Sequence, residues 1–261
     1  LKYFISSTAK SWFFSKPRVI ICIPSGVTEV EKRAVEDAAK QAGAGVVELI
    51  EEPMAAAIGS GLPVSEPTGS MVVDIGGGTS EVAVISLGDI VTATSERVAG
   101  DKFDEAIIKY VRSQYKIMIG EKTAEQIKIG IGSAVDGLRN EEMIIKGRNL
   151  VTGLPDELKL TSAEITKALK EPVRLIVESV KSVLEKTPPE ISADIMDKGI
   201  LMTGGGSLLY GLDKLIESET GVTVNVAENS IEAVAEGTGA VLAYIDKLDK
   251  VVNDQEIVLV E

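Results

Sequence analysis

The stretch MVVDIGGGTSEVAVI, residues 71–85, decides which fold this sequence predicts. An apolar run ends in a carboxylate at Asp74, three glycines follow, and a second run then alternates apolar and polar residues up to Ile85. Alternation with a period of two is typical of a strand, and glycines permit the backbone conformations of a tight turn. The stretch therefore predicts two antiparallel strands joined by a glycine turn.

This glycine turn has the composition of a phosphate-binding loop. Because Gly76, Gly77 and Gly78 carry no side chains, their backbone N–H groups could approach phosphate oxygens closely. Asp74 would then face a magnesium ion through its water shell, since Mg²⁺ keeps several of its waters. The alternative is a plain hairpin turn without a ligand.

A second glycine turn, TGGGSL at residues 203–208, follows an apolar strand predicted from Gly199. A helix is predicted from Leu208 to about Glu217, so free amides and the positive end of the helix dipole would meet at the turn. Close packing of the helix on the strand would also explain these glycines. A single nucleotide bound between two lobes would explain both turns together, and the presence of two such turns favours this interpretation. Neither turn is a Walker A loop, because no Gly-Lys-Ser/Thr follows.

A candidate catalytic carboxylate, Glu52, follows an apolar strand predicted over residues 46–50. It precedes Pro53 and an alanine-rich helix that ends near Gly59. A carboxylate in this place could orient or deprotonate an attacking water molecule. The alternative is an acidic residue that merely stabilises the helix N-terminus through the dipole.

The composition excludes several classes of chemistry. The 261 residues include no histidine and one cysteine, Cys22, so histidine-dependent catalysis and an intrachain disulfide are impossible. Cys22 has apolar neighbours and is predicted to be a buried thiol in a reducing, cytoplasmic protein. The net charge of −13 argues against nucleic acid as a partner. With 44% hydrophobic residues and alternating strand and helix patterns, the chain is predicted to adopt an α/β fold.

The first 18 residues differ from the rest, because they contain basic residues and no acidic one. Trp12, Phe13 and Phe14 lie between Lys10 and Lys16, and three consecutive aromatic side chains cannot all point into one core. Exposed aromatic residues beside lysines suit an anionic membrane surface. Packing against a protein segment outside this sequence is the alternative.

Together and in this order, these elements resemble the actin-like ATPase superfamily, which has a ribonuclease H-like fold, and within it most closely the rod-shape-determining MreB proteins. The resemblance extends from about Leu1 to Lys250. Its most specific segments are IEEPMAAAIG at 50–59, residues 71–84, residues 121–128, KTPPE at 186–190, and TGGGSL at 203–208.

The resemblance implies a role for each candidate residue. Glu52 corresponds to the glutamate that positions the hydrolytic water, and Asp74 to the aspartate that contacts the waters of Mg²⁺. The loop Gly76, Gly77, Gly78 and Thr79 corresponds to the second phosphate loop, and Trp12-Phe13-Phe14 to a membrane-insertion loop. Without the resemblance, Glu125 and Lys128 indicate only a surface ion pair. With it, the segments that border the adenosine are Glu125, Gln126, Ile127 and Lys128, together with Gly204, Gly205, Gly206, Ser207 and Leu208.

The resemblance also implies two similar α/β lobes with a nucleotide cleft between them. The first lobe would comprise residues 1–60 and about 240–261, and the second residues 61–100 and 171–239. A small α+β subdomain would be inserted at about 101–170. The hairpin that carries the family's first phosphate loop is missing from this sequence. The chain is therefore expected to be N-terminally incomplete, and slow ATP hydrolysis is expected of the longer protein.

The function implied is that of a bacterial cytoskeletal protein. ATP-dependent filaments, bound peripherally to the inner face of the cell membrane, would direct cell-wall elongation and maintain rod shape. The expected partners are further copies in protofilaments and filament pairs, the membrane, and cell-elongation membrane proteins. Two alternatives within the superfamily stay open. A sugar-kinase-type phosphotransferase would need a substrate base for which no motif is present, and an Hsp70-like nucleotide-binding domain would need a following substrate domain.

Overall fold

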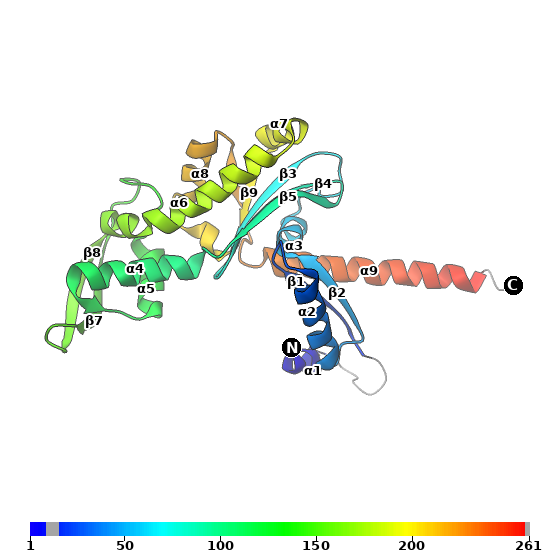
Figure 1. The fold of residues 1–261 in the computed structure, drawn as a ribbon, viewed down its shortest axis with the longest axis horizontal. Helices are drawn as coiled ribbons and strands as arrows, with labels where there is room; N and C mark the ends of the chain where they lie inside the picture. The colour runs from blue at the N-terminus through cyan, green and yellow to red at the C-terminus, as the bar shows by residue number, and fades with distance from the viewer. Residues whose placement is uncertain (9–15, 259–261) are drawn as a thin grey trace.

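The computed structural model describes residues 1–8 and 16–258, and for Thr8 and residues 246–258 only the backbone. The predicted membrane loop, Trp12-Phe13-Phe14, lies outside the described residues. Within them the chain forms three separate β-sheets, each accompanied by helices (Figure 1). Among the described residues, no helix combines the length and the apolar character needed to cross a membrane.

The largest sheet has five strands in the order β10-β9-β3-β4-β5. The predicted hairpin around the first glycine turn is confirmed, because β3 and β4 pair in antiparallel register with Asp74 opposite Glu81. Strands β9 and β10 run parallel to β3, whereas β5 runs antiparallel to β4. The strands are β3 (Ser70–Ile75), β4 (Ser80–Ser86), β5 (Asp89–Glu96), β9 (Ile200–Thr203) and β10 (Val224–Val226).

Two helices cover opposite faces of this sheet, α6 (Ser162–Lys186) and α3 (Glu52–Gly59). Alternate residues of β3 and β4, such as Val73 and Val82, join the main core together with α6. The residues between them, such as Val72 and Ala83, pack with alanines of α3. Because strand side chains alternate between faces, Asp74 and Glu81 lie on the face that α3 covers.

Each of the two smaller sheets is packed against its own helices. A parallel pair, β1 (Arg18–Ile23) and β2 (Val46–Glu51), lies with α1 (Lys2–Thr8) and α2 (Glu29–Gln41). Ile5 of α1 and Ala39 of α2 share a small core with both strands. The antiparallel sheet β6-β7-β8 lies with α4 and α5 on the other side of the molecule (Figure 1). Its elements are α4 (Gly100–Tyr115), β6 (Ile117–Met118), α5 (Glu121–Ile131), β7 (Glu142–Asn149) and β8 (Pro155–Thr161).

The segment after the second glycine turn differs from the prediction. A 3-10 turn, η1 (Gly205–Leu208), follows β9, and helix α8 (Leu212–Thr220) begins four residues later than predicted. Gly211 precedes α8 with a φ of 77°, so the chain turns sharply before the helix starts. The glycine turn is therefore not the N-terminus of α8. The helices α7 (Pro189–Lys198) and α9 (Ala233–Val258) complete the described chain.

The contact between α3 and α9 depends on two glycines. A Cβ atom added to Gly237 would lie 1.9 Å from the carbonyl oxygen of Ala55, and one added to Gly59 would lie 1.9 Å from that of Ala233. The two backbones approach so closely that neither position has room for a side chain.

Cys22 also faces α9, with its Sγ 2.8 Å from Oγ1 of Thr238. The thiol is half-buried, so the prediction of a buried core thiol is wrong.

We expect Gly237→Ala to lower the free energy of unfolding by about 1–3 kcal/mol, because the added methyl group would force α3 and α9 apart. Gly239→Ala is the matched control on the same helix, since a Cβ there meets no atom within 4 Å. It should be neutral or stabilise by up to about 1 kcal/mol through helix propensity. Urea denaturation of both variants tests the contact, and equal effects at the two positions would contradict it.

Candidate functional site

Both glycine turns line one cavity of about 720 Å³. Glu52 and Asp74 lie in its wall, as do Glu125 and Lys128 of α5. Residues far apart in the sequence thus meet around one hollow of the size that a nucleotide needs. The glycine-turn residues that line it are Gly76, Gly77, Thr79, Gly204, Gly205, Gly206 and Leu208.

The first glycine turn leaves space where a ligand could approach its backbone. The turn is closed by a hydrogen bond from the Gly76 N–H to the Thr79 carbonyl oxygen, at 2.9 Å. A Cβ added to Gly78 would meet no atom within 4 Å, and none of these three glycines has a positive φ. Neither packing nor backbone conformation therefore requires glycine at position 78. Gly78 is exposed and is not among the residues that line the cavity, unlike Gly76, Gly77 and Thr79.

The second glycine turn is shaped by packing as well. A Cβ on Gly204, whose φ is 80°, would lie 2.3 Å from the Ile75 carbonyl oxygen, and one on Gly206 would lie 2.4 Å from the Ile75 side chain. Gly205, by contrast, is exposed in the cavity wall, and the atom nearest to a Cβ added there would be 4.0 Å away. Ser207 is buried, and its hydroxyl donates to the Gly204 carbonyl oxygen at 2.6 Å. Close packing thus explains Gly204 and Gly206, and leaves Gly205 available for a ligand.

Asp74, the last residue but one of β3, is a buried carboxylate. The Thr203 hydroxyl donates to its Oδ1 at 2.8 Å, while burial raises the pKa of the carboxyl above its usual value. Among the described residues, no three histidine, cysteine, aspartate or glutamate side chains are arranged so that they could hold a metal ion together. A magnesium ion here would therefore take most of its ligands from water and phosphate oxygens. That arrangement fits the preference of Mg²⁺ and the predicted contact through water.

Glu52 is the first residue of α3 and lines the cavity. Its pKa is raised, first by burial and then by the negative charges of Glu81 and Asp74. A carboxylate with a raised pKa is a better proton acceptor at neutral pH than an ordinary glutamate. The position of Glu52 in the first turn of α3 also fits the alternative explanation, in which the acid stabilises the helix N-terminus through the dipole.

The predicted adenosine segment of α5 is divided between the cavity and the core. Glu125 and Lys128 line the cavity, Gln126 is exposed outside its wall, and Ile127 is fully buried in the main core. A helix turns each successive side chain by about 100°, so four consecutive residues cannot all face one hollow. The Ile127 side chain accordingly contributes to packing rather than to the cavity.

The simple ion pair expected between Glu125 and Lys128 is wrong. The Lys128 ammonium donates to Asp104 Oδ2 at 3.0 Å and to the Gly100 carbonyl oxygen at 3.3 Å, both on α4. Both side chains of this ion pair are largely buried. Lys128 thus ties α5 to the N-terminus of α4 beneath the cavity. Sequence reasoning missed Asp104 because its partner lies 24 residues away.

The mouth of the cavity carries apolar residues that the sequence did not identify. Ile129, Tyr210 and Ile231 are exposed and belong to its lining. Arg139 stacks on the Tyr210 ring, with its guanidinium carbon 5.2 Å from the ring centre, which holds the ring in place. Exposed apolar side chains in the lining of a cavity suit a ligand with a flat apolar part, such as a nucleoside base.

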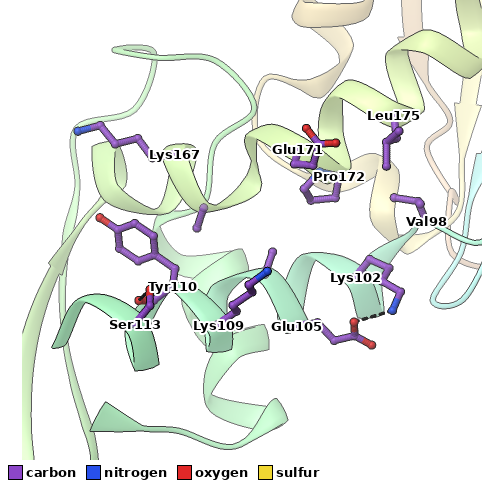
Figure 2. Close-up of a pocket in the computed structure, with 12 residues that line it drawn as sticks. Val98, Lys102, Glu105, Lys109, Tyr110, Ser113, Lys167, Glu171, Pro172 and Leu175 are labelled. Atoms are coloured by element: carbon purple, nitrogen blue, oxygen red, sulfur yellow. Dashed lines mark hydrogen bonds and ion pairs between the residues drawn. The ribbon is translucent and has the colours of Figure 1, made fainter. Parts of the chain in front are cut away.

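A second hollow of about 540 Å³ lies between α4 and α6 (Figure 2). Lys102 pairs with Glu105 at 2.6 Å and Glu171 pairs with Arg174, whereas the lining residues Lys109 and Lys167 form no ion pair among the described residues. Apolar residues such as Val98, Pro172 and Leu175 form much of the remaining wall. It contains no glycine turn and no buried carboxylate, so the features of a phosphate site belong to the first cavity.

The molecule combines a five-stranded mixed sheet with the β1–β2 sheet and with the small unit of β6-β7-β8, α4 and α5. Two glycine turns line one cavity of this assembly. These features define the actin-like fold. The crystal structure of MreB5 of Spiroplasma citri bound to ADP superposes with a TM-score of 0.89 at 41% identity. The match covers 95% of this chain and 75% of that one. The prediction of an actin-like fold is therefore confirmed.

The chain belongs to the MreB/Mbl family, whose model, described as MreB/Mbl protein, matches residues 1–250. It is 54% identical over 247 residues to the cell shape-determining protein MreB of Escherichia coli, covering 94% of this chain and 71% of the relative. It is 52% identical over 250 residues to the cell shape-determining protein Mbl of Bacillus cereus, covering 96% and 75%. The family that the sequence resembled is thus confirmed.

We expect Asp74→Asn to stabilise the protein at pH 7 in buffer without nucleotide or divalent cation. Because burial raises the folded-state pKa, the ionised carboxylate is less favourable in the fold than in the unfolded chain. The stability that protonated Asp74 contributes is complete below its ordinary pKa of 3.8 and is lost as the pH rises through the raised value. The advantage of the asparagine should therefore grow across that window and then stay constant.

Thermal unfolding of both proteins between pH 4 and pH 8 measures this difference. Asp89→Asn, at the exposed start of β5, is the matched control and should leave the profile unchanged. A constant difference between the Asp74→Asn variant and the unmodified protein over the whole range would show that ionisation of Asp74 does not oppose folding.

Proposed function

We propose that this chain is the nucleotide-binding part of a bacterial actin-like cytoskeletal protein that hydrolyses ATP slowly. The observation that carries the proposal is the meeting of Glu52, Asp74 and both glycine turns around one cavity. The relatives named cell shape-determining proteins, and the related structure bound to ADP, support the same assignment.

In this proposal the polyphosphate of ATP lies between the two glycine turns. Backbone amides of Gly77 and Gly78 on one side and of Gly205 on the other would contact its oxygens. The adenosine would lie between α5, at Glu125 and Lys128, and the apolar residues Leu208 and Tyr210. Asp74 would hold the water shell of Mg²⁺, which when bound offsets phosphate charge.

Glu52 would position the attacking water and accept its proton. Its place in the cavity wall and its raised pKa suit a general base that works near neutral pH. Phosphoryl transfer to water depends mainly on positioning and on charge stabilisation, so a single well-placed carboxylate is sufficient. The turnover is expected to be slow.

The two-lobed arrangement would link nucleotide state to assembly. Glu52 follows directly on β2, whereas the glycine turns follow β3 and β9 of the five-stranded sheet. ATP that contacts both lobes would favour a closed arrangement, in which copies stack better along a protofilament, and hydrolysis would weaken it. The lobes would be residues 1–60 with about 240–261, and residues 61–100 with 171–239, with 101–170 as the inserted subdomain.

The filaments would lie at the inner face of the cell membrane and direct cell-wall elongation, and thereby maintain rod shape. Trp12, Phe13 and Phe14, flanked by lysines, would insert into the anionic bilayer surface. Other copies of the chain and cell-elongation membrane proteins would be its partners. Membership of the MreB/Mbl family favours this function over a sugar-kinase or Hsp70-like one.

Glu52→Gln in the protein expressed from its complete gene should lower the rate of phosphate release by about 10²–10⁴-fold, because the amide cannot accept the proton. Binding of ADP, measured by fluorescence titration, should be unchanged. Glu51→Gln is the matched control, since Glu51 ends β2 and is outside the cavity lining. Phosphate release at the unmodified rate from the Glu52 variant would remove Glu52 from catalysis.

Replacing Trp12, Phe13 and Phe14 together by serine should separate membrane binding from assembly. With ATP, but not with ADP, both the unmodified protein and the variant should sediment as filaments. Only the unmodified protein should float with vesicles that contain anionic lipid, because the variant loses the apolar side chains that enter the bilayer. Equal flotation of the two proteins would show that these residues do not bind the membrane, and equal sedimentation with ATP and ADP would contradict nucleotide-dependent assembly.

A further inference from the structure

A second buried carboxylate, Glu81, has no role in the proposed reaction. It lies on β4 and is 0% exposed, and among the described residues only Asp74 is another buried charged side chain. Unlike Asp74, it does not line the cavity. Burying a carboxylate costs several kcal/mol unless hydrogen bonds compensate, so an apolar residue would be the simpler occupant of this strand position.

The two carboxylate oxygens of Glu81 bind different parts of the molecule. The Ser95 hydroxyl, on the neighbouring strand β5, donates to Oε1 at 2.5 Å. The backbone N–H of Ser25, in the loop after β1, donates to Oε2 at 3.1 Å. One side chain thus bridges the five-stranded sheet and the β1–β2 sheet, with one oxygen for each.

The β1–β2 strand pair connects the hydrogen bond between Glu81 and Ser25 to Glu52. Ile23, two residues before Ser25, pairs with Glu51 in the β1–β2 register. Glu51 is followed directly by Glu52, so anchoring Ser25 anchors the end of the strand pair from which Glu52 emerges. On the other side, Glu81 is the cross-strand partner of Asp74. The bridge therefore connects the backbone of the candidate base with that of the phosphate loop.

We propose that Glu81 is a positioning residue that holds Glu52 in register with the phosphate loop by bridging Ser25 and Ser95. The inference rests on the proposed ATP hydrolysis. The bridge is not needed for nucleotide affinity, because Glu81 lies outside the cavity wall. The bridge acts by aligning the attacking water, so its loss should lower kcat and leave KM nearly unchanged.

Two variants of the protein expressed from its complete gene separate the bridge from the charge. Glu81→Gln keeps both hydrogen bonds, because its carbonyl oxygen accepts from Ser25 and its amide group donates to the Ser95 hydroxyl. Glu81→Leu keeps most of the volume and loses both. We expect the leucine variant to lose about 10–100-fold in kcat with KM within about threefold, and the glutamine variant to stay within about threefold of the unmodified kcat.

Hydrogen exchange at the Ser25 amide provides a readout that does not depend on activity. Exchange at this amide should be faster in the leucine variant and unchanged in the glutamine variant, while amides of α6 keep their protection. Ser86→Ala, at the far end of β4, is the control and should change neither measurement. Should the leucine variant fail to fold, Ser95→Ala takes its place, with an expected loss of at least about threefold in kcat and faster Ser25 exchange.

A leucine variant with unmodified kcat and Ser25 exchange would overturn the inference, as would a glutamine variant as slow as the leucine variant. For Ser95→Ala, unmodified values would have the same consequence. An unmodified protein that does not hydrolyse ATP would overturn the proposed function and this inference with it. Hydrolysis by the unmodified protein together with an unaffected leucine variant would overturn the inference alone.

Discussion

The alternation of side chains along β3 and β4 is the constraint on which the rest of the structure depends. One set of residues, including Val73 and Val82, must face the main core under α6. The other set must then face α3, and it includes Asp74 and Glu81. Because α3 begins at Glu52, the period of two along a single hairpin brings three carboxylates to the same junction between two sheets.

Three carboxylates at one poorly solvated junction oppose folding, and the pKa of each is raised mainly by burial. Their negative charges also repel, which adds to the cost. Hydrogen bonds from Thr203, Ser95 and Ser25 offset part of it. The remaining cost distinguishes this junction from the apolar packing around it.

The second glycine turn shows how packing and binding share a few residues. Gly204 and Gly206 let the turn approach the end of β3 so closely that Ile75 touches both, and this contact brings Gly205 to the cavity wall. Of the alternatives that the sequence left open, close packing therefore explains Gly204 and Gly206 but not Gly205. A side chain at position 204 or 206 would collide with Ile75 and lower stability, whereas one at position 205 would meet no atom closer than 4.0 Å.

The sequence by itself determined the hairpin around the first glycine turn, the strands before Glu52 and before the second glycine turn, and both turns, because their patterns depend on neighbours a few residues apart. The capping boxes of Thr28 with Glu31 and of Thr161 with Glu164 are local in the same way, because each joins residues three positions apart. Only the tertiary structure decided which side chains face one another. The partner of Lys128, the burial of Ile127 and the bridge made by Glu81 depend on contacts between segments distant in the chain, which local periodicity does not encode.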